Sequence, residues 1–228
     1  ASAYHWSKQR GGSMAVLEMN EASSGASGRN AGIVVMGRYF ATVKNTVYTH
    51  LQKSRKDLNC AQQDKLSNKF ASIYVQSAYK NADMIEKTIL DENIDCEYSR
   101  NGWIQWKHLD SKKSLDYSVK LGNDFGFNDW TKIEPEYAKK IGGIRLESPA
   151  GFSQRAATWH PAKWVWGLLE IALKSENVKF YTYTKVVKIE DIGTHYLVHT
   201  NRGKIKTRFV INATESYTTL LHPYLKGL

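Results

Sequence analysis

The sequence lacks any long apolar run. The longest, around residues 33–36, falls far short of the ~18 residues that a membrane-spanning helix requires, so we expect no transmembrane segment. Prolines are few, four in 228 residues, and no internal repeat or low-complexity segment is present. Apolar residues make up 42% and charged residues 24%. This composition is typical of a globular protein and excludes disordered and collagen-like classes.

Cysteine is also scarce. Cys60 and Cys96 are too few for a disulfide framework, and neither stands in a Cys-x-x-Cys pair that would indicate structural zinc. His195 and His199 stand four residues apart on a predicted strand, about 13 Å of chain, which is too far for one metal ion. We therefore expect no metal site, and free thiols in a reducing intracellular compartment.

Positive charge is in excess, because 32 Lys and Arg against 22 Asp and Glu give a net charge of +10. Such a balance permits nucleic acid, an anionic membrane or cofactor phosphates as partners. The lysines are scattered, however, and the short basic groups at residues 53–56 and 202–206 are typical of solvated faces or turns. We therefore expect no nucleic-acid partner. A basic chain suits the mitochondrial matrix as well as the cytoplasm, and both stay open.

The apolar pattern predicts an α/β fold. Residues 14–17 form an apolar run without alternation, which is typical of a buried parallel strand. Residues 42–92 follow helical spacing, and we expect their apolar stripe to face the core. This stripe consists of Leu66, Phe70, Ile73, Ser77, Met84, Ile85 and Ile89.

Turn and capping residues locate the remaining elements. Asn101-Gly102 predicts a β-hairpin, and the Pro135 and Pro161 positions are typical of helix starts. Helices are expected at residues 1–9, 111–123, 134–141 and from residue 161. Strands are expected at residues 178–190 (broken near Thr184), 195–200 and 205–212.

An acid at the end of a strand, followed by a loop of small residues, indicates half of a dinucleotide-binding unit. Here Glu18 follows the strand at residues 14–17, and the stretch SGASGRNAG occupies residues 24–32. In such a unit the acid holds the ribose hydroxyls, and small residues let the backbone approach the ligand closely. The unit's first strand and G-x-G-x-x-G turn would lie upstream of Ala1.

The stretch at residues 24–32 resembles the signature of the D-amino-acid-oxidase (DAO) superfamily of FAD-dependent oxidoreductases. Residues 212–223 are most similar to subgroups related to gamma-glutamylputrescine oxidase and its fungal relatives, although Glu215 stands where glycine is frequent. The other matches follow in the family's order: residues 3–5 (first helix), 16–18 (second strand), 160–161 (helix start), 184–190 (strand beside the adenine) and 210–214 (strand end near the cofactor).

This resemblance implies FAD as the cofactor. Glu18 would accept hydrogen bonds from the adenosine ribose, Arg29 and loop N–H groups would face the pyrophosphate and flavin, and Val186 would contact adenine through its backbone. A plain core role explains Val186 equally well. Catalytic residues stay unknown, because the family's substrate contacts lie largely outside this sequence. The implied FAD-binding residues are Glu18, Met19, Ser27, Gly28, Arg29, Asn30, Ala31, Gly32, Val186, Ala213 and Thr214.

The resemblance also implies how the chain divides. Residues 1–40 would form the first segment of a Rossmann-like FAD-binding portion, without its first strand and G-x-G-x-x-G turn. Residues 41–149 would form covering helices and the start of an α+β substrate domain. Residues 150–228 would form the second FAD-binding segment, with a three-stranded meander. Because family members are considerably longer, we expect truncation at both ends, or a partner protein that supplies or covers the missing segments.

The implied activity is FAD-dependent oxidation of the C–N bond in a small amine or amino acid, with hydride transfer to the flavin. The imine product would be hydrolysed by water, and oxygen or an electron carrier would reoxidise the flavin. The alternative is a non-catalytic homologue that serves as a structural subunit of a larger, mitochondrial or other, assembly. An enzyme would carry flavin, whereas a scaffold need not.

Overall fold

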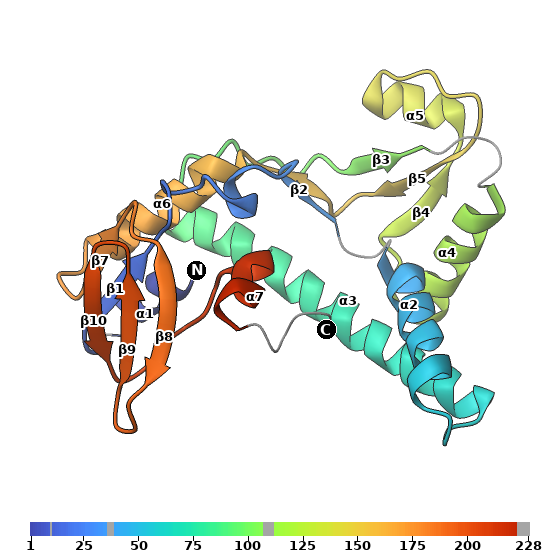
Figure 1. Cartoon of the computed structure of the whole chain (residues 1–228). Coiled ribbons are helices and arrows are strands. Elements are labelled where there is room, and N and C mark those ends of the chain that lie inside the picture. Colours follow the sequence, from blue (N-terminus) through green and yellow to red (C-terminus); the bar gives the residue numbers. More distant parts are fainter. Residues whose placement is uncertain (10, 36–38, 107–111, 223–228) are drawn as a thin grey trace. The chain divides into compact units, whose positions relative to one another are not determined.

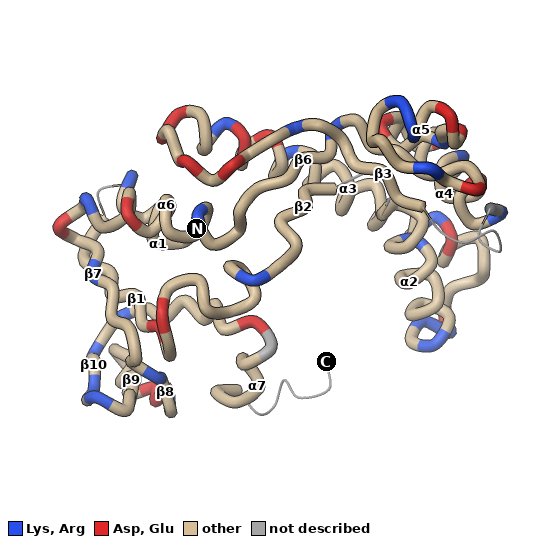
Figure 2. Tube along the Cα trace, turned by 90° about the horizontal axis from the view of Figure 1, so that it is seen from above, with Lys and Arg blue, Asp and Glu red and all other residues tan. Residues whose placement is uncertain are grey.

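A computed structural model describes residues 1–9, 11–35, 39–106 and 112–222. The chain forms two compact units, one made of Ala1–Asn30 with Pro161–Leu228 (unit 1) and the other of Ala31–His160 (unit 2). Both units combine helices with strands, in agreement with the α/β composition predicted above (Figure 1). Lys and Arg lie interspersed with Asp and Glu along the chain trace (Figure 2).

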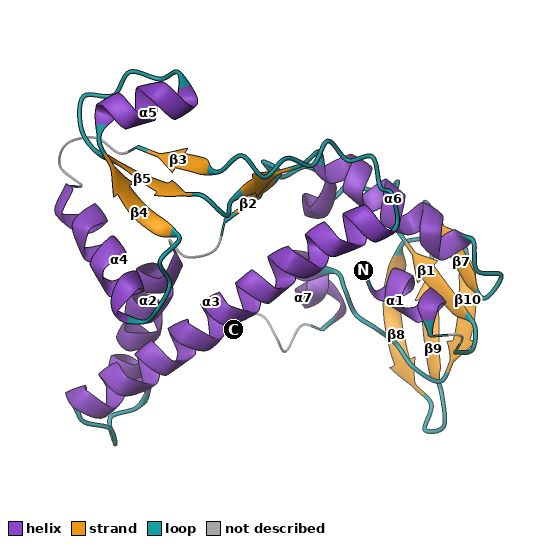
Figure 3. Ribbon diagram, turned by 180° about the vertical axis from the view of Figure 1, so that it is seen from behind, coloured by secondary structure: helices purple, strands orange, loops and turns teal. Residues whose placement is uncertain are grey.

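Unit 1 contains a parallel strand pair and an antiparallel meander. Strand β1 pairs in parallel with β7, in register from Met14 with Val178 to Leu17 with Tyr181. The meander runs in the order β10-β9-β8 and is visible from behind in Figure 3. Helices α1 and α6 pack together, and Leu168 and Ala172 of α6 are buried. The elements are α1 Ser2–Lys8, β1 Met14–Leu17, η1 Ala26–Gly28, α6 Pro161–Leu173, β7 Val178–Tyr181, β8 Val186–Asp191, β9 Tyr196–Thr200, β10 Gly203–Thr207, η3 Glu215–Tyr217 and α7 Thr218–Leu221.

Unit 2 packs helices beside a three-stranded antiparallel sheet of order β3-β5-β4. Its core centres on Phe40, Ala71, Val75 and Phe127, where α2 and α3 meet the segment after α4. A separate short pair joins β2 to β6. The elements are β2 Ile33–Val34, α2 Tyr39–Ser54, α3 Cys60–Asp91, β3 Trp103–Gln105, α4 Lys112–Asp124, β4 Trp130–Ile133, α5 Pro135–Gly142, β5 Ala150–Ser153 and β6 Ala157–Thr158.

The predicted helix over residues 42–92 is two helices. Helix α2 ends at Ser54, and α3 begins after Asn59, whose side chain accepts the Gln62 N–H while the Gln62 side chain accepts the Asn59 N–H. This reciprocal capping box satisfies two N–H groups that a helix start otherwise leaves free. The interruption was missed because the helical periodicity continues across it.

The apolar stripe expected to face the core on α3 does not. Leu66, Phe70, Ile73 and Met84 are between 40% and 57% exposed, and Ile89 is the one member that is buried. The side of α3 that packs inward carries smaller and more polar residues. These buried residues are Gln63, Ser67, Ala71, Val75, Ala82 and Ile89. Close packing of α2 on α3 requires small side chains, so hydrophobicity alone indicated the wrong side of the helix.

Three strand predictions also need correction. The hairpin at Asn101-Gly102 does not form, because β3 pairs with β5, which comes from a distant part of the chain. Residues 14–17 do form the predicted parallel strand, but none of them is fully buried, since β1 pairs with β7 along one edge in the described chain. The last strand ends at Thr207, and Phe209, Val210 and Ile211 are exposed beyond it.

Candidate functional site

Glu18 directly follows β1, at the carboxyl end of the parallel pair. Its N–H donates to the Tyr181 carbonyl at 2.9 Å, and its own carbonyl accepts the Thr184 N–H at 2.8 Å. The side chain is half-buried, and its Oε1 accepts the Asn20 N–H at 2.8 Å. The carboxylate predicted to bind ribose is therefore held at the strand end by its own loop.

The β7–β8 turn is fastened to the residues after Glu18. The Tyr183 N–H donates to the Asn20 carbonyl at 3.0 Å, and the Tyr183 hydroxyl donates to Glu21 Oε1 at 2.6 Å. This hydrogen bond to a carboxylate raises the pKa of Tyr183. Val186 begins β8 three residues later. The structure therefore brings Val186 to the same end of the strand pair as Glu18.

The loop at residues 24–30 folds into the short helix η1. Within it, the N–H groups of Gly28 and Arg29 donate to the carbonyls of Gly25 (3.2 Å) and Ala26 (3.3 Å). The Asn30 side chain donates to the Ala26 and Ser27 carbonyls at 3.2 and 3.0 Å. All of these donors form hydrogen bonds to carbonyl groups of the same turn. The Arg29 side chain is exposed and makes no hydrogen bond or ion pair with the described residues, so its guanidinium can meet an anion.

Gly28 is buried where η1 approaches the preceding loop. A Cβ at this position would lie 2.1 Å from the carbonyl oxygen of Ser23 and 2.5 Å from its Cβ. Ser23 itself has a positive φ of 66°. Glycine is therefore required at residue 28 by a backbone approach within the loop, in addition to any ligand.

Ala213 and Thr214 lie in the segment that leads into η3 and α7. Asn212 Oδ1 accepts both the Thr214 N–H at 3.2 Å and the Thr214 hydroxyl at 2.6 Å. Helix α7, which follows this segment, contacts β8. Glu215 has a positive φ of 49°. This backbone conformation is one that glycine adopts without steric cost.

Three further residues predicted to bind FAD, Met19, Ala31 and Gly32, lie outside η1 and β8. Met19 follows Glu18 and is 37% exposed. Ala31 and Gly32 belong to unit 2. Gly32 is buried, has φ of 64°, and its carbonyl accepts the Trp159 N–H at 2.9 Å. Ala31 is exposed. All other residues predicted to bind FAD lie in unit 1. Glu18 and Val186 lie at the same end of the strand pair, and Ala213 and Thr214 precede the helix that contacts β8.

These residues fit FAD. Among the described residues, the Glu18 carboxylate receives one hydrogen bond, so its second oxygen can accept a ribose hydroxyl. The Arg29 guanidinium supplies a positive charge suited to phosphate. The loop between them is built from small residues, which lets a ligand come close to it, although the Gly28 and Arg29 N–H groups already bond within the turn. A carboxylate at the end of a parallel strand can bind the ribose hydroxyls of a dinucleotide, and a cation on the adjoining loop can bind its phosphates.

A family model for FAD-dependent oxidoreductases, of the DAO type, matches residues 1–228. The chain belongs to the DAO family. The DAO family is FAD-dependent, and the predicted family, the predicted fold and the predicted cofactor are thereby confirmed.

Several solved structures share this DAO fold. Glycine oxidase from Geobacillus kaustophilus has a TM-score of 0.67 at 16% identity, covering 97% of this chain and 53% of its own. L-amino acid deaminase from Proteus myxofaciens has a TM-score of 0.67 at 19% identity, covering 96% and 44%. L-alpha-glycerophosphate oxidase from Mycoplasma pneumoniae, solved with FAD bound, has a TM-score of 0.62 at 14% identity, covering 96% and 53%.

The chain spans about half the length of these solved structures. No curated protein sequence matches it significantly. None of the helices in the described ranges combines the length and the apolar character that a bilayer crossing requires. Nor do the described residues contain a group of three or more His, Cys, Asp and Glu side chains that could hold a metal ion.

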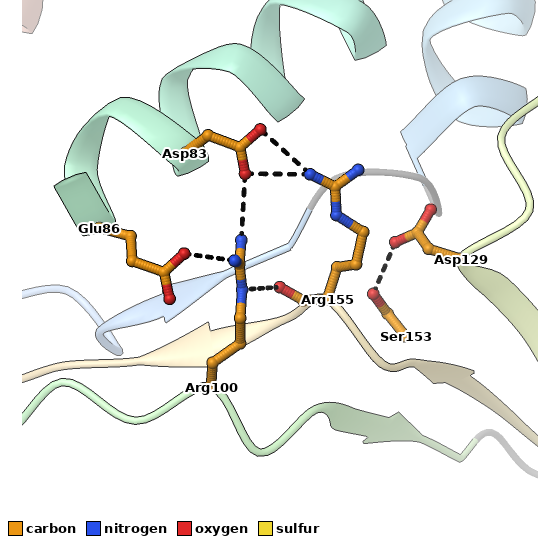
Figure 4. A network of polar contacts seen from close by, with 6 residues as sticks. All are labelled: Asp83, Glu86, Arg100, Asp129, Ser153 and Arg155. Carbon is orange, nitrogen blue, oxygen red and sulfur yellow. Dashed lines mark hydrogen bonds and ion pairs between the residues drawn. The ribbon is translucent and has the colours of Figure 1, made fainter.

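Sequence analysis missed a polar network in unit 2 (Figure 4). Asp83 of α3 accepts hydrogen bonds from Arg155 at 3.0 and 3.2 Å and from Arg100 at 3.3 Å. Arg100 also pairs with Glu86 and donates to the Arg155 carbonyl at 3.2 Å. Asp83 and Arg155 are 72 residues apart, and no local motif connects them. Only the folded chain shows that they meet.

Proposed function

We propose that this protein oxidises the C–N bond of a small amine or amino acid, with FAD as the hydride acceptor. The observation that carries the proposal is Glu18, a half-buried carboxylate at the end of a parallel strand in a DAO-family chain. Two of the similar structures are named as a glycine oxidase and an L-amino acid deaminase, and these names are the reason for proposing an amine substrate. Their identities below 20% support the fold alone, and the third, a glycerophosphate oxidase, has a different substrate.

The residues of this chain would bind and orient the cofactor. Glu18 would accept a ribose hydroxyl with the oxygen that Asn20 leaves open, and Arg29 would pair with a phosphate oxygen. Val186, Ala213 and Thr214 would contact it from β8 and the segment that leads into η3. When bound, FAD supplies the acceptor for the hydride that leaves the carbon next to nitrogen. Water then converts the imine to a carbonyl compound and free amine or ammonia, and oxygen or an electron carrier takes the two electrons.

Anaerobic mixing with a substrate panel tests the reaction. Glycine, L-alanine, D-alanine, L-proline and putrescine form the amine set, and glycerol 3-phosphate and L-lactate form the C–O set. We expect at least one amine, and neither C–O compound, to bleach the visible absorbance of the flavin. Bleaching by the C–O set alone would contradict C–N oxidation while leaving the family assignment intact.

The second candidate is a structural subunit that keeps the fold and has lost the reaction. Exposed apolar residues on α3 and at residues 209–211 favour contact with further protein, whether of this chain or a partner. Such a subunit would show no flavin absorbance and would co-purify with a fixed partner. Flavin in the purified protein, together with bleaching by an amine, would contradict it.

A further inference from the structure

The antiparallel meander of unit 1 gathers basic side chains on one of its two faces. Its three strands lie side by side (Figure 3), and His199 of β9 stands directly opposite Lys188 of β8 and Lys204 of β10. Residues that stand opposite each other on neighbouring strands share a face of the sheet, and so do residues two apart on one strand. This cationic face consists of Lys188, Glu190, Leu197, His199, Lys204 and Lys206.

The cationic face is the solvent-facing side of the meander. The reverse side carries Val198, which is buried, and Ile205, which is half-buried. On the cationic face, Lys204 and Lys206 are exposed, and the side chain of Lys188 is 62% exposed. The lysines therefore point to solvent from a sheet that buries its apolar residues on the other side.

The acidic residues of the meander neutralise only part of this charge. Residues 185–208 contain six Lys and Arg but only two acids, Glu190 and Asp191. Glu190 Oε2 is shared between His199 Nε2, at 2.9 Å, and Lys188 Nζ, at 3.3 Å. Asp191 accepts an N–H group of its own turn at 2.8 Å. Neither acid pairs with the lysines of β10.

Lys204 and Lys206 therefore keep their full charge. Their side chains form no ion pair or hydrogen bond with any described residue. The two lysines start about 7 Å apart along β10, and Lys188 starts about 10 Å away across β9. The basic group at residues 202–206, interpreted from sequence as a solvated face or turn, is thereby joined by a lysine from a second strand.

Apolar side chains adjoin the lysines. Val187, in the β-bulge beside Lys188, is 54% exposed, and Ile192, in the turn after β8, is 47% exposed. Basic residues next to exposed apolar ones are typical of protein surfaces that bind the interface of a membrane. There the cations attract anionic headgroups, and the apolar side chains enter the boundary with the acyl chains.

The residue types on the cationic face favour a lipid surface over other anionic partners. Protein interfaces are depleted of lysine and enriched in arginine and aromatic residues, whereas this face has lysine and neither of the others. Single-stranded nucleic acid requires aromatic side chains for stacking, and duplex DNA is read by an element that enters a groove. An anionic bilayer requires neither, and each lysine near its surface strengthens binding about fivefold.

We propose that the cationic face docks this protein onto a bilayer that contains anionic lipids, with the ammonium groups of Lys188, Lys204 and Lys206 at the headgroups. The docking is peripheral and reversible, and it weakens as salt screens the charges. All of the residues involved belong to unit 1. The proposal does not rest on the oxidation proposed above.

Cosedimentation of the whole chain with large unilamellar vesicles at neutral pH tests the proposal. One set of vesicles is phosphatidylcholine alone, and the other contains about one-third phosphatidylserine. We expect the partition coefficient to be about tenfold or more higher for the anionic vesicles, and this difference to be lost when salt rises from about 0.05 M to about 0.5 M. Equal binding to both sets, or no binding to either, would overturn the proposal. Tighter binding to a short DNA duplex or to polyglutamate at the same salt would overturn the bilayer as the partner.

Two paired variants assign the binding to the cationic face. The double variant Lys204→Gln/Lys206→Gln changes exposed side chains and should fold, and we expect it to weaken binding to the anionic vesicles about tenfold or more. The control is Lys139→Gln/Lys140→Gln, the same change at two exposed lysines of α5 in unit 2, which should bind normally. Equal losses in the two double variants would show that net charge, and not the cationic face, attracts the bilayer. Unchanged binding by Lys204→Gln/Lys206→Gln would refute the assignment.

Discussion

At the scale of single residues, two carboxylates are held by different means. Glu18 is fixed by the N–H of a residue two positions away, which is a local contact. Its place could be predicted from sequence because a strand and its terminal acid are neighbours in the chain. Asp129 is fixed by Ser153, 24 residues away, and lies near Arg155. No sequence pattern could predict that contact, because its residues come from separate segments.

Asp129→Asn should stabilise the protein at neutral pH. Because burial raises the pKa of Asp129 in the folded state, its contribution to stability is complete below the ordinary Asp pKa near 3.8 and is lost as the pH rises through the folded pKa. The neutral amide avoids this loss. Thermal unfolding at neutral pH should give a higher midpoint for the variant, and the difference should shrink as the pH falls toward 3.8. A variant less stable than the wild type at neutral pH would contradict this assignment.

Gly28→Ala should disrupt the loop proposed to face FAD. Its Cβ would lie 2.1 Å from the Ser23 carbonyl oxygen, so the loop must open, at a cost of about 1–3 kcal/mol. Gly25→Ala in the same loop is the control, because its Cβ meets no atom within 4 Å. FAD affinity, followed by flavin fluorescence quenching, should fall for Gly28→Ala and change little for Gly25→Ala. Equal affinity for the two variants would show that the loop does not contact FAD.

Glu18→Gln should weaken FAD binding by about tenfold or more, since hydrogen bonds to a charged group are worth about 1.5–3 kcal/mol each. Glu21→Gln is the matched control, three residues along the same loop, where the carboxylate bonds to the Tyr183 hydroxyl. Equilibrium dialysis against FAD measures both. If the two variants lose the same affinity, Glu18 has no special role at the ribose.

At the scale of elements, tertiary packing determined the buried side of α3 and the pairing partner of β3, neither of which the sequence pattern predicted. The strand at 14–17, the helices predicted at 111–123 and 134–141 (found at 112–124 and 135–142) and the break before β8 are marked locally in the sequence. The inward side of α3 was wrong, because the contact with α2 selects small residues such as Ala71 over the larger Phe70. The hairpin at Gly102 was wrong because β5 supplies the partner of β3.

A matched pair of phenylalanines tests the corrected helix side. Phe40 is fully buried against Ala71, Val75 and Phe127, whereas Phe70, predicted to be in the core, is 53% exposed. We expect Phe40→Ala to lower the free energy of unfolding of unit 2 by about 3–5 kcal/mol and Phe70→Ala to lower it by about 1 kcal/mol or less. Urea denaturation followed by circular dichroism gives both values. A larger loss of unfolding free energy for Phe70→Ala than for Phe40→Ala would show that the predicted apolar stripe of α3 faces the core after all.

At the scale of the whole molecule, the chain matches the family model over residues 1–228, which is about half the length of its solved relatives. The residues expected at the cofactor lie mostly in unit 1, and the polar network lies in unit 2. Val210 and Ile211, expected at the end of a strand near the cofactor, are instead exposed. Apolar exposure of this kind supports the proposal that further protein covers unit 1. Sequence resemblance gave the family, whereas exposure is a property of the folded chain.

The absorbance spectrum of the natively purified protein, recorded from the near ultraviolet through the visible, tests the central claim that this chain binds FAD. We expect the flavin bands to remain after desalting, and FAD to be the flavin released on denaturation. A colourless protein that also takes up no FAD from solution would contradict the account and leave the structural-subunit proposal in its place.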